Sequence, residues 1–543
     1  MVGLLQKVGA HRPGDSIYCS STRGKTKRSG GLFRLLLEKE RCKPQEILHV
    51  GDNAHSDGYI PKKLGIQTIL VDTKPNRYEE LALREGIAQN LGSLAYLIPG
   101  YSRIIRQKLG GSFDSSKDRL KILKAIGADI AGPILVSYVL WVLRDAENQG
   151  IKRLYFISRD GQILLEIASR IQKSLKGSIE LRYLYGSRQA WFLPAVNSIE
   201  PQELSWAFQV DPILTPLILA RRLSLNPDDL VSEMSLELKR KVQPHQTLSP
   251  REIETARRII FRPHLLLKLE RSIDHSWKEA VSYLKQEGLS SLEPWAIVDV
   301  GWLGRSQKCL ESILSKAGMS RQILGYYFGL YSYPIGADPH LLRTFLFDPN
   351  SDQERPAAYR MFPLFLELFT AADHGTTMGY QKDAGKQCWV PILKKNGDGI
   401  VLEWGLSALT EGILGFVDFI PRDLLLRWKS LAEQQKEVIC RMLRSLIDSP
   451  GGAEACALGA FPFSADQSET IIKPIALPFR FASFLKYLTV WKPRERDSFT
   501  LWFEGTLAQS GKLFQIAWFL LKPLRQATRL LKRLILKAVE GNS

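Results

Sequence analysis

The stretch Glu46–Val71, EILHVGDNAHSDGYIPKKLGIQTILV, contains a complete strand–loop–helix–strand pattern. The run Ile47–Val50 has the pattern of a strand that is buried on both faces, and Gly51 ends it. Residues 59–64 fit a short helix, and residues 66–71 fit a second strand. Strands that alternate with helices are typical of α/β proteins, so this stretch indicates that fold class.

Two carboxylates follow the first of these strands. Asp52 comes directly after Gly51, and Asp57 lies five positions further along the same loop. Ligands of open α/β sheets bind at the edge where the strands end. Magnesium prefers a few carboxylates together with several water molecules. The loop therefore predicts a magnesium site made by Asp52 and Asp57.

This stretch resembles motif IV of the haloacid dehalogenase (HAD) superfamily, in which a strand ends in Gly-Asp and a second Asp follows. Upstream, the run 16–19 that ends in Ser20 is similar to motif II, and Lys27 lies at the position of the motif III lysine. The resemblance implies phosphoryl transfer through an aspartyl-phosphate. In that reaction Ser20 and Lys27 would bind the phosphoryl group, the two acids would bind Mg²⁺, and Lys27 and Asp52 would be the catalytic residues. A cation, an ammonium and a hydroxyl all offset charge on a transferring phosphoryl group.

The nucleophile of that superfamily is the first Asp of a DxD motif, on a strand well before motif II. Residues 1–15 contain one acid, Asp15, and it follows no apolar strand. The resemblance thus covers about the first hundred residues and the back half of the domain, motifs II to IV. Two expectations follow: the chain starts late within a longer protein, or this domain does no chemistry.

Composition limits the class of protein. The chain has 543 residues, enough for about two to four domains. Its formal net charge of +18 predicts an acidic partner, such as anionic lipid, nucleic acid, or phosphorylated and anionic sugars. The six cysteines form no CxxC pair, which argues against a zinc ribbon or a disulfide framework and favours a reducing cytoplasm.

The region after the first domain begins with a long helical pattern. Apolar residues recur at helical spacing over residues 119–149, and Gly132-Pro133 should kink or divide that helix. Asp129 and Asp145 are expected on its solvated side. No apolar run in the sequence reaches the roughly 18 residues that a membrane-spanning helix needs.

The expected fold class is α/β, with a partial HAD-like Rossmannoid half-domain, a larger Rossmann-like three-layer α/β domain and a basic helical C-terminal tail. The expected boundaries are residues 1–100 for the half-domain, 101–118 for a linker, 119–380 for the second domain with a helical insert at about 201–287, 381–497 for a mainly helical extension, and 498–543 for the tail.

Polar residues end several strands of the second domain. The motifs are SRDG after residues 151–157, YGSR at the end of the strand 181–186, and DVGWLGR after residues 295–298. Together they supply six candidate ligand-binding residues: Ser158, Asp160, Ser187, Arg188, Asp299 and Arg305. Glycines at helix starts let backbone N–H groups approach an anion, so these residues predict a pocket for a phosphate or an anionic sugar. Alternatively, the serines and aspartates cap helices and the arginines pair with surface acids.

The second domain also resembles the HAD pattern weakly. SRDG looks like motif I, with Ser158 in place of the nucleophile and Asp160 at the acid/base position, and Ser187 ends a strand like that of motif II. As a whole the chain resembles large bacterial predicted HAD-superfamily hydrolases whose long C-terminal region is associated with surface polysaccharide synthesis. Glu367 and His374 would act as general acids if their segment reaches the pocket, and otherwise form a helix face and a turn.

The C-terminal segment Lys512–Ala538 carries seven Lys or Arg residues and no acid. Its apolar residues follow helical spacing, so it predicts a basic amphipathic helix with Pro523 as a break. Such a helix suits an anionic membrane surface, although a helix docked on the protein with its basic face in water has the same pattern. No recognised motif supports nucleic-acid binding.

Two function hypotheses remain. The first is a Mg²⁺-dependent phosphatase of the HAD type, linked to surface polysaccharide biosynthesis and lacking its nucleophile motif. The second is a non-catalytic or transferase-type protein that binds a phosphorylated or nucleotide sugar at the second domain. Both are expected in the cytoplasm, the second at the inner membrane face. The sequence does not indicate an oligomeric state.

Overall fold

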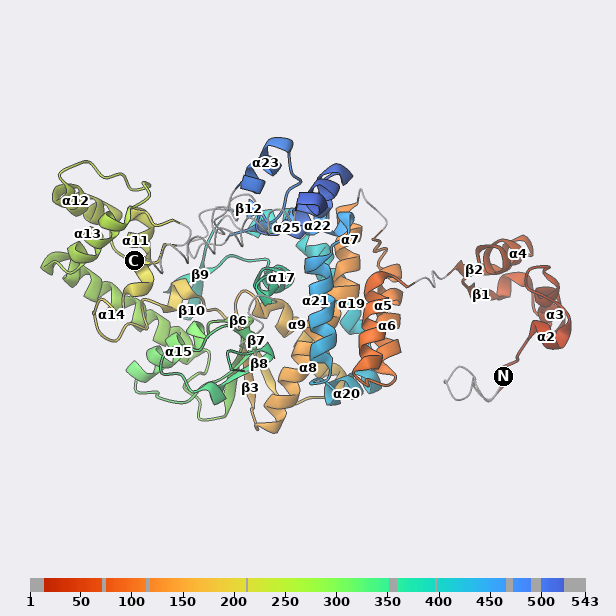
Figure 1. The fold of residues 1–543 in the computed structure, drawn as a ribbon. Coiled ribbons are helices and arrows are strands. Elements are labelled where there is room, and N and C mark those ends of the chain that lie inside the picture. The colour runs from red at the N-terminus through yellow and green to blue at the C-terminus, as the bar shows by residue number, and fades with distance from the viewer. Residues whose placement is uncertain are drawn as a thin grey trace. The chain divides into compact units, whose positions relative to one another are not determined.

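The computed structural model describes residues 14–70, 75–113, 118–210, 213–350, 359–395, 398–464, 472–489 and 500–521 (Figure 1). The chain divides into two compact units, Met1–Asn76 and Arg77–Ser543. The first unit therefore ends earlier than residue 100, the boundary expected from the sequence.

Unit 1 contains the expected strand–loop–helix–strand pattern. Its elements are α2 (Ser20–Arg23), α3 (Gly31–Glu40), η1 (Pro44–Glu46), β1 (Leu48–Gly51), η2 (Ala54–Tyr59), α4 (Ile60–Lys63) and β2 (Gln67–Leu70). The two strands are parallel, with Leu48 opposite Gln67 and Gly51 opposite Leu70. Asp52 and Asp57 lie between β1 and α4, as the pattern predicts.

Two details of unit 1 differ from the prediction. The first strand is not buried on both faces, since Leu48 is 55% exposed and Val50 is 54% exposed. Their side chains share one face of a sheet that has only two strands, and no described element covers that face. Residues 16–19 form no strand, and Ser20 instead begins the short helix α2.

Unit 2 begins with two helices, α5 (Arg77–Ala88) and α6 (Leu94–Lys108). The predicted linker from 101 to 118 therefore starts inside α6, where Ser102, Ile105 and Arg106 are buried. The Gly- and Ser-rich letters that suggested a linker lie after this helix, and residues 114–117 are outside the described part of the chain.

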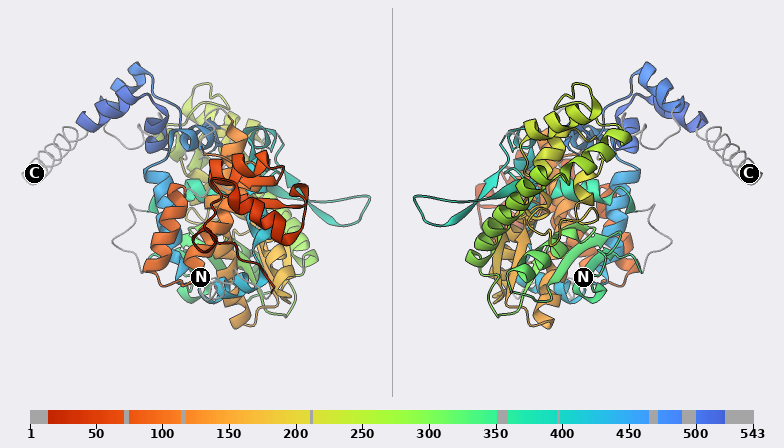
Figure 2. Two further views of the ribbon diagram at one scale, coloured as in Figure 1. Left: turned by 90° about the vertical axis from the view of Figure 1, so that its right-hand side faces the viewer. Right: turned by 90° about the vertical axis from the view of Figure 1, so that its left-hand side faces the viewer.

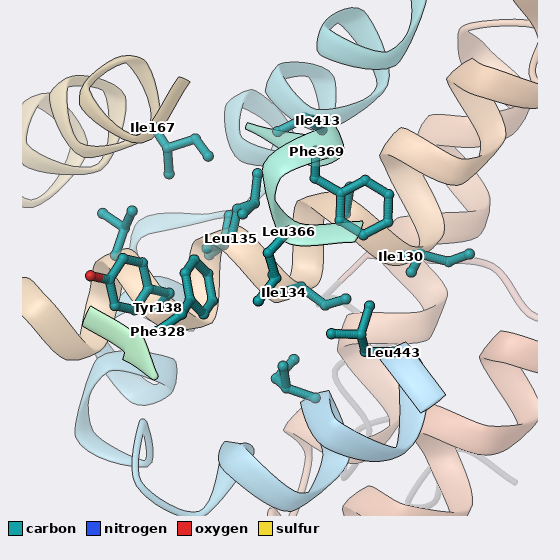
Figure 3. Packing of buried hydrophobic residues seen from close by; sticks show 14 of the residues in the cluster. Ile130, Ile134, Leu135, Tyr138, Ile167, Phe328, Leu366, Phe369, Ile413 and Leu443 are labelled. Carbon is teal, nitrogen blue, oxygen red and sulfur yellow. The ribbon is translucent and has the colours of Figure 1, made fainter. Parts of the chain in front are cut away.

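Next comes a continuous helical stretch, Arg119–Asn148, made of α7 (Arg119–Ile126), a π turn η3 (Gly127–Ala131) and α8 (Gly132–Asn148). Within the described residues it is the one helix long and apolar enough to span a membrane, contrary to the expectation from the sequence. Its apolar window is wholly buried inside unit 2, which is typical of the core helix of a globular domain. Figure 3 shows residues of this helix packed in that core.

Asp129 was expected on the solvated side of this helix. In the structure it is buried, with only 2% of its surface exposed. The Arg106 guanidinium pairs with the Asp129 carboxylate and lies 2.8 Å from the Glu79 carboxylate. The charge of Asp129 is therefore balanced inside the protein by Arg106 of α6, a helix whose packing the local sequence around Asp129 does not reveal.

The central sheet of unit 2 is parallel throughout. Its strands are β3 (Arg153–Ile157), β4 (Glu180–Leu184), β5 (Trp295–Val298), β6 (Gly301–Trp302), β7 (Leu324–Leu330) and β8 (Leu342–Phe347). They are arranged as β4-β3-β5-β7, with β6 and β8 also paired to β7. Val298 lies opposite Tyr326 and Gly301 opposite Gly329, so β5 and β6 form one interrupted strand along β7. With β8 on the far side of β7, the order corresponds to the doubly wound order 2-1-3-4-5.

Helices cover both faces of this sheet. Leu154 and Phe156 of β3 belong to the hydrophobic cluster that includes α8 and α9 (Gly161–Leu175). The alternate residues Tyr155 and Ile157 belong to a second cluster, with α14 (Pro263–Gln286) and α15 (Arg305–Lys316). The predicted three-layer Rossmann-like architecture is therefore confirmed at this level.

The segment between β4 and β5 is the predicted helical insert. It contains α10 (Arg188–Trp191), η4 (Ser205–Phe208), α11 (Pro216–Arg222), α12 (Pro227–Leu238) and α13 (Pro250–Ile260), followed by α14. These helices bury a core of their own, which includes Leu219, Leu230 and Ile259. Ser249 and Glu252 form a capping box at the start of α13.

After β8 the chain is mainly helical. The helices are α17 (Phe362–Phe369), α18 (Asp398–Trp404), α19 (Leu406–Phe419), α20 (Arg422–Ser430), α21 (Gln435–Asp448), α22 (Gly452–Gly459), α23 (Phe481–Thr489), α25 (Phe503–Gln509) and Lys512–Leu521. The antiparallel pair β9 (Thr377–Lys382) and β10 (Trp389–Leu393) and the short pair β11 (Pro462–Phe463) and β12 (Lys473–Pro474) were not predicted. Residues 522–543, the rest of the predicted basic helix, lie outside the described residues.

Candidate functional site

The candidate site lies where the winding of the unit 2 sheet reverses. The helix after β3 packs on one face of the sheet, and α15, which follows β5 and β6, packs on the other. The loops after the neighbouring strands β3 and β5 therefore diverge, and a crevice at such a switch point is the usual ligand site of doubly wound sheets. Asp160 and Asp299 lie on these two loops.

Ser158 and Ser187 hold the loops around this point together. Ser158 Oγ donates to the Gly186 carbonyl at 2.8 Å and lies 3.2 Å from Thr377 Oγ1. Ser187 Oγ accepts from the Ala190 N–H at 3.1 Å and donates to the Thr377 carbonyl at 2.5 Å. The capping alternative is thus confirmed for Ser187, and both hydroxyls tie β3 and β4 to the start of β9.

The Asp160 carboxyl is the most perturbed acid of the site. Burial and, to a smaller extent, the nearby negative charges of Glu367 and Asp299 together raise its pKa to about 8, against the opposing effects of Arg159 and Thr370. Thr370 Oγ1 donates to Asp160 Oδ1 at 3.0 Å. Asp160 still keeps part of its surface exposed, so a ligand can reach it.

Asp299 has a lower pKa than Asp160. Burial raises the pKa of this carboxyl to about 6, while the N–H groups of Val300 and Gly301 and the charge of Arg188 favour its ionised form. The Val300 N–H donates to Asp299 Oδ1 at 2.8 Å. Asp160 is therefore mainly protonated at neutral pH, and Asp299 is mainly ionised.

Glu367 on α17 is the third acid. Trp302 Nε1 donates to its carboxylate at 2.8 Å, which connects α17 to β6. Burial raises the pKa of Glu367, and the charges of Arg188 and Arg159 oppose that rise. Glu367 thus lies on a helix, as one interpretation expected, and close enough to Asp160 and Asp299 for its charge to raise the pKa of both.

Positive charge at the site comes from Arg159 and Arg188. Both guanidiniums favour ionisation of Glu367, and Arg188 also favours ionisation of Asp299. Arg188 is exposed, and its side chain makes no hydrogen bond or ion pair with any of the described residues. An exposed arginine beside partly ionised acids is available to an anionic ligand group.

Tyr183 and His374 form another edge of the site. Tyr183 Oη lies 2.7 Å from His374 Nε2, and His374 Nδ1 lies 2.9 Å from the Gly375 carbonyl. Since the carbonyl only accepts, His374 Nδ1 donates to it. Nearby, Gln162 Nε2 donates to Asp373 Oδ1 at 2.7 Å.

Arg305 is placed differently from the prediction that grouped it with the others. It is the first residue of α15 and lines a groove of about 1000 Å³ together with Lys308, Trp206 and Tyr333. No hydrogen bond or ion pair joins Arg305 to the three acids in the described part of the chain. Of the six predicted residues of unit 2, the structure gathers five around the switch point.

Unit 1 brings together part of its own predicted site. Lys27 Nζ lies 2.7 Å from Asp57 Oδ1, and His49 Nε2 lies 2.9 Å from the same oxygen. The Asn53 N–H donates to Asp57 Oδ2 at 3.1 Å. Burial opposes ionisation of Asp57, but these hydrogen bonds and the charge of Lys27 outweigh it and lower the pKa to about 2.

Asp52 and Ser20 are both exposed, and no hydrogen bond connects Ser20 to the Lys27–Asp57 pair among the described residues. Three donors already contact the Asp57 carboxylate, which leaves Asp52 as the more accessible ligand. No three His, Cys, Asp or Glu side chains within the described ranges lie close enough together to enclose a metal ion. Of the two predicted metal ligands, the exposed Asp52 is therefore the one that could hold a magnesium ion, with water as the other ligands.

Several residues of the site were missed by sequence reasoning. Thr370, Thr377 and Trp302 contact the predicted residues, but they come from a helix end, an unpredicted strand and the extension of β5. Only Trp302 carried a usable signal in the sequence, because it lies within the motif DVGWLGR that begins at Asp299. Neither a protein-family model nor a curated protein sequence matches this chain.

Proposed function

We propose that unit 2 is an enzyme of the transferase type that acts on a phosphorylated or nucleotide sugar bound at the switch point of its parallel sheet. The observation that carries this proposal is the pair Asp160 and Asp299, two acids on neighbouring strand ends with pKa values of about 8 and about 6. Environments that separate the pKa values of two acids in one site are typical of acid and base catalysts.

The charges of the site suit a ligand with both an anionic group and hydroxyl groups. The exposed guanidiniums of Arg159 and Arg188 would bind the phosphate, because an arginine forms two parallel hydrogen bonds with it. The ionised carboxylate of Asp299 would accept hydrogen bonds from sugar hydroxyls. The rings of Tyr183, Tyr185 and Trp302 are half-buried nearby and offer flat apolar surfaces to a sugar.

Asp160 would act as the general acid. When the bond between the transferred group and its leaving oxygen breaks, that oxygen gains negative charge and needs a proton. A carboxyl with a pKa close to the working pH holds this proton and releases it in the transition state. The acceptor hydroxyl then loses its proton to Asp299 or to solvent, so that the protons balance over the reaction.

A ligand panel tests this proposal. Sugar 1-phosphates and nucleotide sugars are added to the full chain, and we expect at least one class to raise its melting temperature. Turnover is then followed by ³¹P NMR, with Asp160→Asn as the variant and the exposed Asp274→Asn as the control. We expect Asp160→Asn to bind the ligand with turnover reduced at least about 100-fold. Failure of the whole panel to bind, or full turnover by Asp160→Asn, would contradict the proposal.

A second candidate function concerns unit 1, and the 2.7 Å contact of Lys27 with Asp57 favours it. Here unit 1 is a phosphoryl-binding site of the HAD type. Bound Mg²⁺ would offset phosphoryl charge, with Asp52 as its ligand, Lys27 and Ser20 would contact the phosphoryl oxygens, and Asp57 would position Lys27. The assay is calorimetric titration of the full chain with inorganic phosphate in the presence of Mg²⁺. Binding that Asp52→Ala abolishes and Glu38→Ala preserves would support this function, and no binding, or equal binding by all three proteins, would exclude it.

A further inference from the structure

The helix Lys512–Leu521 near the end of the described chain is apolar except for Lys512 and Gln515 in its first turn. Phe514, Ala517, Trp518 and Leu521 pack against a small hydrophobic cluster that contains Phe479, Phe484 and Tyr487. The opposite side of the helix consists of Leu513, Ile516, Phe519 and Leu520, which are 82%, 57%, 78% and 64% exposed. A helix without a polar face is normally buried, either in a protein core or in lipid.

The neighbouring helix α23 adds to the exposed apolar surface. Phe481 is 70% exposed and Leu485 is 47% exposed, and the two are one helical turn apart. Phe484 and Tyr487 of the same helix contact Phe514 and Trp518, so the two helices lie side by side. Figure 2 shows them, in blue, at the outside of unit 2. The exposed set is thus Phe481, Leu485, Leu513, Ile516, Phe519 and Leu520.

The charge around this set indicates what covers it. The described residues 472–489 contain Lys473, Arg480 and Lys486 and no acid, and the helix itself begins with Lys512. The sequence then continues to residue 538 with six further Lys or Arg residues and no acid. The described acid between these helices is Glu504 of α25, so cations still outnumber acids around the exposed set. Large apolar side chains with mainly cations near them fit the boundary between the acyl chains and headgroups of an anionic bilayer.

We propose that the exposed set inserts into the surface of an anionic membrane and holds the protein there. The six Lys or Arg residues that follow Leu521 in the sequence favour a position of these helices in the interface over one that spans the bilayer. The flanking cations contact the lipid headgroups, while the phenylalanine and leucine side chains enter the upper acyl region.

Vesicle sedimentation tests this proposal with the full chain. We expect binding to phosphatidylcholine vesicles that contain phosphatidylglycerol and much weaker binding to pure phosphatidylcholine vesicles. The variant Leu513→Gln/Phe519→Gln keeps every charge and should lower the partition coefficient by about tenfold or more, because two large side chains no longer enter the lipid. A second variant, Phe481→Gln/Leu485→Gln, should weaken binding in the same direction.

The control is Leu236→Gln/Leu292→Gln, which removes two leucines that are 72% and 98% exposed elsewhere in unit 2. It should bind vesicles like the unmodified protein. Circular dichroism checks that all variants are folded, as expected for side chains that point outward. Unchanged binding of both test variants would mean that charge alone attracts the protein and would overturn the proposal. The proposal would also be overturned if the protein bound to no vesicles. A dimer in size-exclusion chromatography that Leu513→Gln/Phe519→Gln dissociates would overturn it as well.

Discussion

At the scale of the residue, Asp160 combines a cost to stability with a use in chemistry. Its pKa in the folded protein is about 8, against 3.8 for an ordinary aspartate. Between these values the folded protein holds a proton that the unfolded chain has lost. Stability therefore falls as pH rises from about 4 to about 8. Groups with strongly shifted pKa values are concentrated at functional sites, where they serve the chemistry although they lower the stability of the protein.

Replacing this acid should change the dependence of stability on pH. We expect Asp160→Asn to gain stability over the unmodified protein by roughly 1–3 kcal/mol between pH 5 and pH 8, since the amide does not ionise. Denaturant midpoints at the two pH values measure this difference. The exposed Asp274→Asn should leave the dependence unchanged. If the stability of Asp160→Asn and that of the unmodified protein changed equally between pH 5 and pH 8, the Asp160 carboxyl would be ionised over this whole range.

The Lys27–Asp57 pair gives stability the opposite dependence on pH from that of Asp160. The pKa of Asp57 is lowered to about 2, so its contribution to stability is present above pH 4 and is lost as pH falls through about 2. We expect Lys27→Met to destabilise unit 1 by about 1–2 kcal/mol at neutral pH, because a buried carboxylate loses a partner. Hydrogen exchange of β1 and β2 should then become faster. The exposed Lys25→Met is the control, and equal exchange in both variants would contradict the account.

At the scale of the element, the central helix of unit 2 crosses α19 at two glycines. A Cβ atom on Gly127 would lie 2.4 Å from the Leu409 carbonyl oxygen, and one on Gly412 would lie 2.3 Å from the Lys124 carbonyl oxygen. The backbones are therefore in direct contact, and the crossing holds the helix that covers one face of the sheet.

A methyl group at this crossing should force the helices apart. We expect Gly412→Ala to destabilise the protein by at least about 2 kcal/mol in denaturant unfolding. Gly100 in α6 provides the control, because nothing lies within 4 Å of a Cβ atom built there. Gly100→Ala should stabilise the protein by about 0.5–1 kcal/mol through helix propensity. Similar effects of the two substitutions would show that the helices are not in contact.

The strands of the sheet were predictable because each is a short apolar run with a clear end. β3, β5 and β7 follow the predicted ranges closely, and their ends carry Asp160 and Asp299 as expected. The pair β9 and β10 was missed, since GTTMGY contains glycine and little alternation. Glu367 was predicted only as an alternative, because a helix pattern does not show which site its acid faces. The burial of Asp129 depends on Arg106 and Glu79, contacts that no local pattern reveals.

At the scale of the whole molecule, the chain forms two compact units. Unit 1 has a two-stranded parallel sheet with one apolar face exposed, whereas unit 2 buries a parallel sheet between two layers of helices. Parallel strands are usually covered on both faces, and a small sheet with an open face has little apolar burial to stabilise it. Unit 1 should therefore be the less stable of the two.

Calorimetry of the full chain should show two transitions, the first with the smaller enthalpy. Lys27→Met should lower only the first midpoint, and Gly412→Ala only the second, because each substitution lies in a different unit. A single transition shifted by both substitutions would mean that the units unfold together.

The most direct test of the central claim is the affinity of the switch point for an anionic sugar, measured by calorimetric titration with the best ligand of the panel. We predict that Arg188→Met raises the dissociation constant at least about tenfold, since the phosphate loses its guanidinium, while the exposed Arg221→Met leaves the constant unchanged. Equal affinity of the unmodified protein and both variants would contradict the placement of the ligand at this site.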